Sequence, residues 1–200
     1  MSLLLLGLGA AACGGERDLG SLSSLSVTPS VSPSATVAQD KYVAMFPNCQ
    51  ELARKVPNLP PLRYNKDVSA GGYRGVSCEF ATPPTGSSVS VELTSWQSVP
   101  NDPRLPPEVI SGQRAARDRF TNDTDLVNDG AAQDLRLGEQ VKWQRPSNND
   151  SCYLTILDGN AVLRFRYSIL GGTRLDPKSE QCRGPLRELA KSLYDAVQPH

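Results

Sequence analysis

Histidine is nearly absent from the 200-residue chain, because the only one is the last residue, His200. This excludes Ser-His-Asp and Cys-His catalysis and any zinc site built on several imidazoles. No lysine stands three residues after a serine, so the Ser-x-x-Lys pattern of another hydrolase class is missing as well. We therefore expect no enzymatic activity and no cofactor.

An excess of either charge is also missing, since 21 Lys and Arg residues balance 21 Asp and Glu residues. A chain without net charge has no global field that would draw it to nucleic acid or to an acidic surface. We expect no nucleic-acid partner, and a charged partner must be met by a local patch.

The apolar run at residues 3–9 is too short to span a bilayer, and small residues at positions 10–12 lead from it to Cys13. This layout is typical of a secretion signal and its cleavage site, so we predict that residues 1–12 are a signal peptide. No Lys or Arg precedes Leu3. We therefore expect that the signal peptide is truncated and that translation starts further upstream.

The residues before Cys13 resemble the lipobox of bacterial lipoproteins, although Ala10 stands where a leucine is usual. The resemblance implies that Cys13 carries a lipid that holds the protein in the cell membrane on its extracytoplasmic side. Residues 13–39 are rich in serine and proline and have too little apolar surface to fold. We interpret them as a tether, which at roughly 5 to 6 Å times the square root of its length spans about 25 to 30 Å.

Residues 40–200 are long enough for one folded domain, and their first half predicts a helix followed by a hairpin. Asn48 and Glu51 form a capping-box pattern for a helix over residues 48–56. Two runs of alternating apolar residues follow, around Cys78 and Val91. With residues 83–86 as the loop, Phe80 faces Val89, Cys78 faces Val91 and Val76 faces Leu93, all on one face of the sheet.

The second half predicts a helix from Pro107 to about Phe120, a polar loop over 122–130, three strands and a terminal helix. A loop at residues 145–150 sets Trp143 opposite Cys152. A two-residue turn at Asp158-Gly159 sets Ile156 against Ala161, Leu154 against Leu163 and Cys152 against Phe165. Gly184-Pro185 opens the last helix, whose apolar residues recur at helical spacing (Leu186, Leu189, Ala190, Leu193, Val197).

The fold class expected from these patterns is α+β, an antiparallel sheet with one face packed by helices. The element order also suggests two degenerate αββ-type halves with little residue identity. Apart from Cys13, the even cysteine count (Cys49, Cys78, Cys152, Cys182) predicts two disulfides in an oxidising compartment. Four cysteines allow three pairings. We predict Cys49–Cys78 and Cys152–Cys182, because each pair joins an inward strand position to a nearby helix start within its own half.

Residues 40–198 resemble a family of actinobacterial exported lipoproteins. The resemblance rests on Phe46-Pro47-Asn48-Cys49 before a short helix, Val76-Ser77-Cys78-Glu79-Phe80 in a strand, and Cys182 before an Ala- and Leu-rich terminal helix. The family is a domain of unknown function behind a signal peptide, a lipidated cysteine and a linker. It implies a stapled α+β fold and transfers no catalytic residue.

One candidate binding surface follows from the predicted register on the sheet face opposite the core. Lys142, Tyr153 and Arg164 fall in one cross-strand row, with Arg166 in a neighbouring row. A tyrosine flanked by cations can stack on a sugar ring or hold an anion such as a lipid headgroup. The alternative is a solvated sheet face with local cation–π packing.

The acidic stretch from Asp123 to Gly130 departs from the EF-hand pattern, because Val127 occupies a ligand position and Asn128 stands where the glycine belongs. We interpret it as a solvated turn and predict no metal site. Taken together, the sequence predicts a lipid-anchored cell-envelope lipoprotein that acts as a binding or accessory module. Its partner is an envelope glycan, an anionic lipid or a protein, and the alternative function is a carboxylate-dependent envelope hydrolase.

Overall fold

The computed structural model describes residues 39–84, 86–98, 111–148, 150–171 and 174–199. The predicted signal peptide and Cys13 lie outside these residues, as does the predicted tether except for residue 39. The helices are α1 Cys49–Lys55, α2 Gly112–Thr121 and α3 Glu180–Val197, with the short 3-10 helix η1 at Gln133–Leu135. The strands are β1 Leu62–Asp67, β2 Tyr73–Ala81, β3 Ser87–Trp96, β4 Val127–Ala131, β5 Gln140–Arg145, β6 Ser151–Asp158 and β7 Ala161–Ile169.

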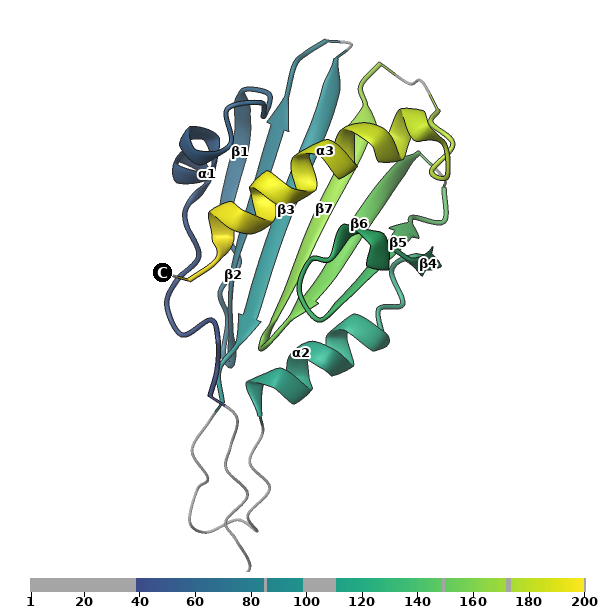
Figure 1. Ribbon diagram of the computed structural model, residues 1–200. Coiled ribbons are helices and arrows are strands. Elements are labelled where there is room, and N and C mark those ends of the chain that lie inside the picture. Colours follow the sequence, from purple (N-terminus) through teal and green to yellow (C-terminus); the bar gives the residue numbers. More distant parts are fainter. Residues whose placement is uncertain (1–38, 85, 99–110, 149, 172–173, 200) are drawn as a thin grey trace, which may run out of the picture. The chain divides into compact units, whose positions relative to one another are not determined.

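The strands form one antiparallel sheet in the order β1-β2-β3-β7-β6-β5-β4 (Figure 1). Two meanders, β1 to β3 and β4 to β7, meet where β3 pairs with β7. The predicted fold class, α+β with an antiparallel sheet, is confirmed. Each meander follows a helix, α1 in the first half and α2 in the second, but the second half has one more strand and the additional helix α3. A duplication stays a prediction.

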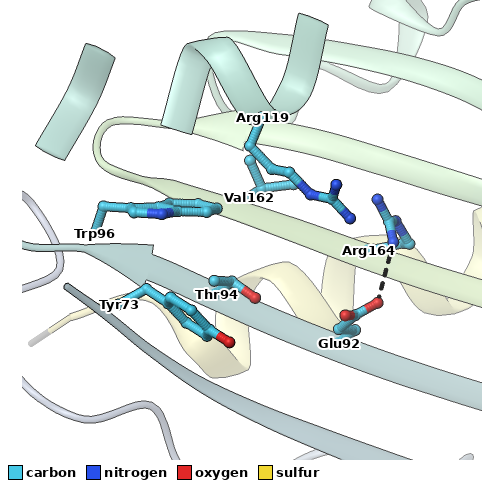
Figure 2. A pocket seen from close by; sticks show the side chains of 7 residues that line it. All are labelled: Tyr73, Glu92, Thr94, Trp96, Arg119, Val162 and Arg164. Carbon is cyan, nitrogen blue, oxygen red and sulfur yellow. Dashed lines mark hydrogen bonds and ion pairs between the residues drawn. The ribbon is translucent and has the colours of Figure 1, made fainter. Parts of the chain in front are cut away.

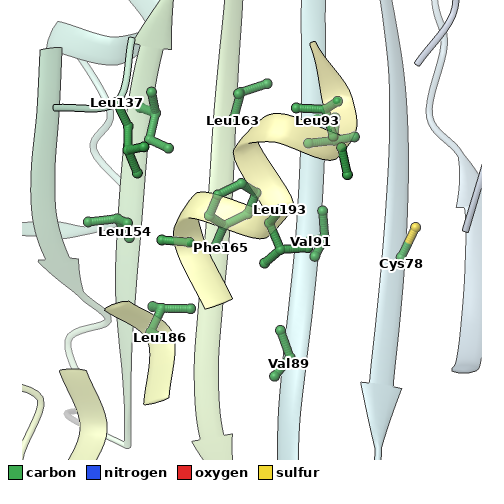
Figure 3. Close-up of a cluster of buried hydrophobic side chains, with 14 of the residues drawn as sticks. Cys78, Val89, Val91, Leu93, Leu137, Leu154, Leu163, Phe165, Leu186 and Leu193 are labelled. Carbon is green, nitrogen blue, oxygen red and sulfur yellow. The ribbon is translucent and has the colours of Figure 1, made fainter. Parts of the chain in front are cut away.

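The main core lies between the sheet and the helices α1 and α3, on what we call the inner face. Alternate residues of the central strands, such as Val91, Leu154 and Phe165, are fully buried there. Figure 3 shows Leu186 and Leu193 of α3 meeting these strand residues, and Figure 1 shows α3 lying across the sheet. Apolar residues recur at every second position in the strands and at helical spacing in α3, and together they form this single apolar layer.

Helix α2 packs on the opposite, outer face, so helices cover part of both faces. Ala116 and Phe120 of α2 form a second, smaller cluster with Leu157 and Val162, and Trp96 packs against it. These strand residues alternate with the inner-face residues Ile156 and Leu163, which places the cluster on the other side of the sheet. The outer face, which holds the predicted binding residues, is therefore partly covered by a helix.

The first hairpin has the predicted register. Phe80 pairs with Val89, Cys78 with Val91 and Val76 with Leu93. The amide of Thr82 donates to the carbonyl of Ser87 at 3.1 Å, which closes the predicted loop.

The predicted registers of the second meander are wrong by two residues. Trp143 pairs with Leu154 instead of Cys152, and Leu154 pairs with Phe165 instead of Leu163. The tight turn is Gly159-Asn160, since Asp158 pairs with Ala161 and Gly159 has φ +60°, which favours glycine. Asn160 is fully buried and donates to the Trp96 carbonyl at 2.6 Å, which fixes it in the turn. An error of two residues keeps every side chain on its predicted face.

Two edge strands were not predicted, β1 and β4, and both have largely exposed side chains. Without a buried face they carry no apolar alternation, which is why 127–130 was interpreted as a loop. Both are irregular: the pairing shifts between Leu62 and Tyr64 in β1 and between Asn128 and Gly130 in β4. Bulges of this kind blunt exposed sheet edges against pairing with other chains.

The helix starts were predicted less well than the helices themselves. The capping box of α1 is present as predicted, with Asn48 Oδ1 accepting from the Glu51 amide at 3.0 Å. Helix α2 begins after Ser111 and not at Pro107, which lies outside the described residues. Helix α3 begins after Ser179, so Pro185 is inside it. In both cases a serine side chain caps the helix, and a serine cap decides the start where a proline stands nearby.

Both predicted disulfides are confirmed. Cys49 is joined to Cys78 and Cys152 to Cys182, with Cα–Cα distances of 5.6 and 6.1 Å. Cys182 lies in the first turn of α3 and not before the helix. The disulfides indicate an oxidising environment. No helix in the described ranges is both long and apolar enough to cross a membrane.

A buried carboxylate fixes the segment before α1 to the C-terminal end of the domain. Asp158 accepts hydrogen bonds from Lys41 Nζ at 2.7 and 2.8 Å, from the Tyr42 hydroxyl at 2.6 Å and from the Tyr194 hydroxyl at 2.9 Å. Burial raises the pKa of Asp158, but these hydrogen bonds lower it more, so the net pKa lies below its usual value. Burial and the bond to Asp158 raise the pKa of Tyr42, and they raise the pKa of Tyr194 to about 12.

Candidate functional site

The outer face holds the residues that sequence analysis selected for binding, but in a different arrangement. Lys142 and Arg164 both lie opposite Thr155, in the row that continues to Glu92 of β3. Tyr153 lies one row along, between Gln144 and Arg166. The prediction of a tyrosine flanked by Lys142 and Arg164 in one row is therefore wrong, as a result of the two-residue register error.

Lys142 holds the end of α2 against the sheet. Its ammonium group donates to the carbonyl oxygen of Phe120 and lies 4.3 Å from the centroid of the Phe120 ring. A cation is favourable at the C-terminal end of a helix, where carbonyl groups lack partners. Burial lowers the pKa of Lys142. Its contacts are therefore those of a structural residue.

Arg164 holds the segment that follows α2. Its Nη2 pairs with Asp123, whose side chain is only 1% exposed, and its Nη1 lies 3.2 Å from Glu92 Oε2. Two carboxylates thus share one guanidinium, in a pairing that joins three separate elements. Arg164 Nε is buried and has no hydrogen-bond partner among the described residues.

Tyr153 and Arg166 remain a local pair. The Arg166 guanidinium lies 5.8 Å from the centroid of the Tyr153 ring, within the range of a cation–π contact. Burial raises the pKa of Tyr153, and the charges of Arg166 and Arg164 oppose this shift. This contact is the local cation–π packing that was the alternative to a binding surface on this face.

A pocket of about 280 Å³ opens on the same face, next to α2. We call it the Tyr73–Trp96 pocket. Tyr73 at the start of β2 pairs with Trp96 at the end of β3, and their ring centroids lie 6.4 Å apart at an interplanar angle of 43°. The other residues that line it are Glu92, Thr94, Arg119, Val162 and Arg164. In Figure 2 the two aromatic rings lie toward one end and the charged groups of Arg119, Arg164 and Glu92 toward the other.

The charged end of the pocket is open to solvent. The side chains of Glu92 and Arg119 are 45% and 41% exposed, and Arg119 pairs loosely with Asp125 at 3.5 Å. The lining therefore offers aromatic faces at one end and a carboxylate and guanidinium groups at the other, with Thr94 between them. Such a mixture of apolar walls and a few polar groups is typical of small-ligand sites, and the volume is close to the lower limit of their range.

The predicted register of the first hairpin already placed Tyr73 opposite Trp96, so these residues could have been selected from the sequence. Arg119 could not, because its place depends on where α2 packs. The acidic stretch after α2 is also not a single solvated turn. Asp123 pairs with Arg164, Asp125 with Arg119 and Asp129 with Arg145, and residues 127–131 form β4.

The chain matches no protein-family model, no curated protein and no solved structure.

Proposed function

We propose that the protein is a lipid-anchored lipoprotein of the cell envelope whose folded domain binds an envelope glycan in the Tyr73–Trp96 pocket. The observation that carries the proposal is the aromatic pair at one end of the pocket with charged groups at the other. A sugar ring has an apolar face of C–H groups that packs on an aromatic ring, and its hydroxyls need hydrogen-bond partners. Tyrosine and tryptophan suit this role because each combines a large apolar body with a polar tip.

The location in the envelope rests on two supports. The disulfides indicate an oxidising compartment. The sequence before Cys13 resembles a lipobox, and Cys13 lies outside the described residues. A tether between lipid and domain gives a binding module the reach to contact wall material while it stays in the membrane.

The alternative, a carboxylate-dependent hydrolase, has weaker support. Glycoside hydrolysis usually needs two carboxyl groups that flank the bond, roughly 5 to 9.5 Å apart. Among the described residues that line the pocket, Glu92 is the one carboxylate, and it is paired with Arg164. A binding role requires no second carboxylate.

Photo-crosslinking in intact cells, followed by mass spectrometry of the captured material, tests the proposal. We expect glycan capture by the native protein and at least a fivefold loss in a Tyr73→Ala, Trp96→Ala variant. Tyr64→Ala is the matched control, because Tyr64 is a 51% exposed aromatic residue on β1 outside the pocket. Equal capture by all three proteins would overturn the pocket assignment. Cleavage of envelope material by the purified protein, abolished by Glu92→Gln, would favour the hydrolase.

The anchor needs a separate experiment. We expect the intact mass of the membrane-fraction protein to show a lipid on Cys13 and the absence of residues 1–12. Cys13→Ser should release the protein into the medium or trap its precursor. A protein that remains unlipidated and retains Met1 would contradict the anchor and leave the glycan pocket untouched.

A further inference from the structure

A second concave surface lies beside the residues that precede α3 and is separate from the Tyr73–Trp96 pocket. It is a depression of about 400 Å³, and its lining shares no residue with that pocket (Arg145, Arg174, Leu175, Asp176, Pro177, Lys178). A neighbouring depression also includes Arg174, together with Arg166 and Asp150. Four cations thus line the two depressions: Arg145 of β5, Arg166 of β7, and Arg174 and Lys178 of the loop before α3.

One buried carboxylate pairs with two of the cations that line this depression and with Arg183 of α3. Asp129, with a side chain 2% exposed, lies 2.9 Å from Arg145 Nε, 3.6 Å from Arg183 Nη2 and 3.9 Å from Lys178 Nζ. One carboxylate therefore meets three cations. This arrangement holds Arg145, Lys178 and Arg183 close to one another.

The cationic groups are held in place by further contacts. Arg183 Nε donates to the carbonyl of Pro177 at 3.0 Å, and its guanidinium lies 4.9 Å from the centroid of the Trp143 ring. Arg183 Nη2 is buried and has no hydrogen-bond partner among the described residues. Arg174 is exposed and forms no ion pair within the described part of the chain.

We propose that this depression, the Arg174–Lys178 site, binds a phosphate group. Its lining holds three cations (Arg145, Arg174 and Lys178) and one carboxylate (Asp176), and the side chains of Arg174 and Lys178 are exposed. A phosphate monoester carries close to two negative charges near pH 7. Guanidinium forks match the geometry of phosphate oxygens, and lysine adds a point charge. The phosphate belongs either to a soluble compound or to a lipid headgroup.

Titration of the full chain carrying Cys13→Ser with inorganic phosphate, at constant ionic strength maintained with chloride, tests the proposal. We expect saturable binding by ³¹P NMR and at least a tenfold weaker affinity in an Arg174→Gln, Lys178→Gln variant. Both side chains are exposed, so the fold should be unaffected. Arg114→Gln is the matched control, since its side chain is 77% exposed and lies on α2. It should change the affinity less than twofold.

The same proteins, mixed with vesicles of phosphatidic acid, whose headgroup is a phosphate monoester, or of phosphatidylcholine, distinguish the two sources of phosphate. Preferential binding to phosphatidic acid that is lost in the Arg174→Gln, Lys178→Gln variant supports a headgroup. Binding of inorganic phosphate without this preference supports a soluble phosphate. Absence of both, or equal losses in the Arg114→Gln control, overturns the site. None of these results depends on glycan binding.

Discussion

The inner and outer faces of the sheet are both packed against helices, but through different kinds of contact. On the inner face, α1 and α3 bury a continuous apolar layer, and both disulfides lie within it. On the outer face, α2 buries a small apolar cluster and is held by Lys142 and Arg164. The comparison assigns most of the stability to the inner face and leaves a concave, chemically mixed surface on the outer face.

The largest expected effect distinguishes the two apolar clusters. Phe165→Ala in the inner core should lower the free energy of unfolding by about 3 to 5 kcal/mol, because it leaves a cavity in a fully buried layer. Phe120→Ala in the outer cluster should cost roughly 2 kcal/mol, since fewer neighbours surround it. Urea unfolding measures both values. Equal losses would show that the two faces contribute alike.

Removal of the disulfides is expected to have the next largest effect. The two bonds close loops with sequence separations of 29 and 30 residues. In the chain-entropy model, each should contribute roughly 3 to 4 kcal/mol. We expect nearly equal losses for the paired alanine variants of Cys49 with Cys78 and of Cys152 with Cys182. A difference above about 2 kcal/mol would mean that native packing, and not loop closure, dominates.

The outer ion pair should show coupling that an exposed pair lacks. Arg164→Met leaves the buried Asp123 without its cation and should cost roughly 2 to 3 kcal/mol, while a double variant with Asp123→Asn should cost less than the sum of the single variants. The exposed pair Arg114–Asp118 is the matched control, with an expected coupling below about 0.5 kcal/mol. Similar coupling in the two double-mutant cycles would contradict the role assigned to Arg164.

The contrast between the faces also explains what the sequence could predict. Alternation around Val91 and Phe165 identified the inner-face strands, because burial on one face imposes period 2. The exposed edges β1 and β4 carry no such pattern and were missed. The partners of Lys142 and Arg164 are the Phe120 carbonyl and Asp123. Both depend on where α2 packs, which its few apolar residues do not specify.

The smallest effect concerns the Asp158 network at the polar end of the inner face. The pKa of Tyr194 is about 12 in the folded protein and about 10 in an unfolded chain, so its contribution is complete below pH 10 and is lost as the pH rises toward 12. Tyr194→Phe should cost about 1 kcal/mol at pH 7 and flatten the loss of stability between pH 10 and 12. Urea unfolding across this pH range checks the prediction. A variant whose free energy of unfolding falls with pH as steeply as that of the native protein would refute it.

The same network also predicts a loss of stability at acid pH, in the opposite direction of pH change. The pKa of Asp158 is lowered in the folded protein, so its contribution is present at neutral pH and is lost as the pH falls below the usual value of 3.8. Asp158→Asn should make stability less dependent on pH in this range. A variant with the native acid slope would exclude Asp158 as its source.

The central claim, that the outer face binds a glycan between Tyr73 and Trp96, can be tested by fluorescence. The chain has two tryptophans, with Trp96 in the outer pocket and Trp143 in the inner core. In a Trp143→Phe variant only Trp96 emits, and we predict a saturable change in its emission when envelope glycan fragments are added. A Trp96→Phe variant, which keeps Trp143, should give no such change. Unchanged Trp96 emission, or an equal change from Trp143, would contradict the account.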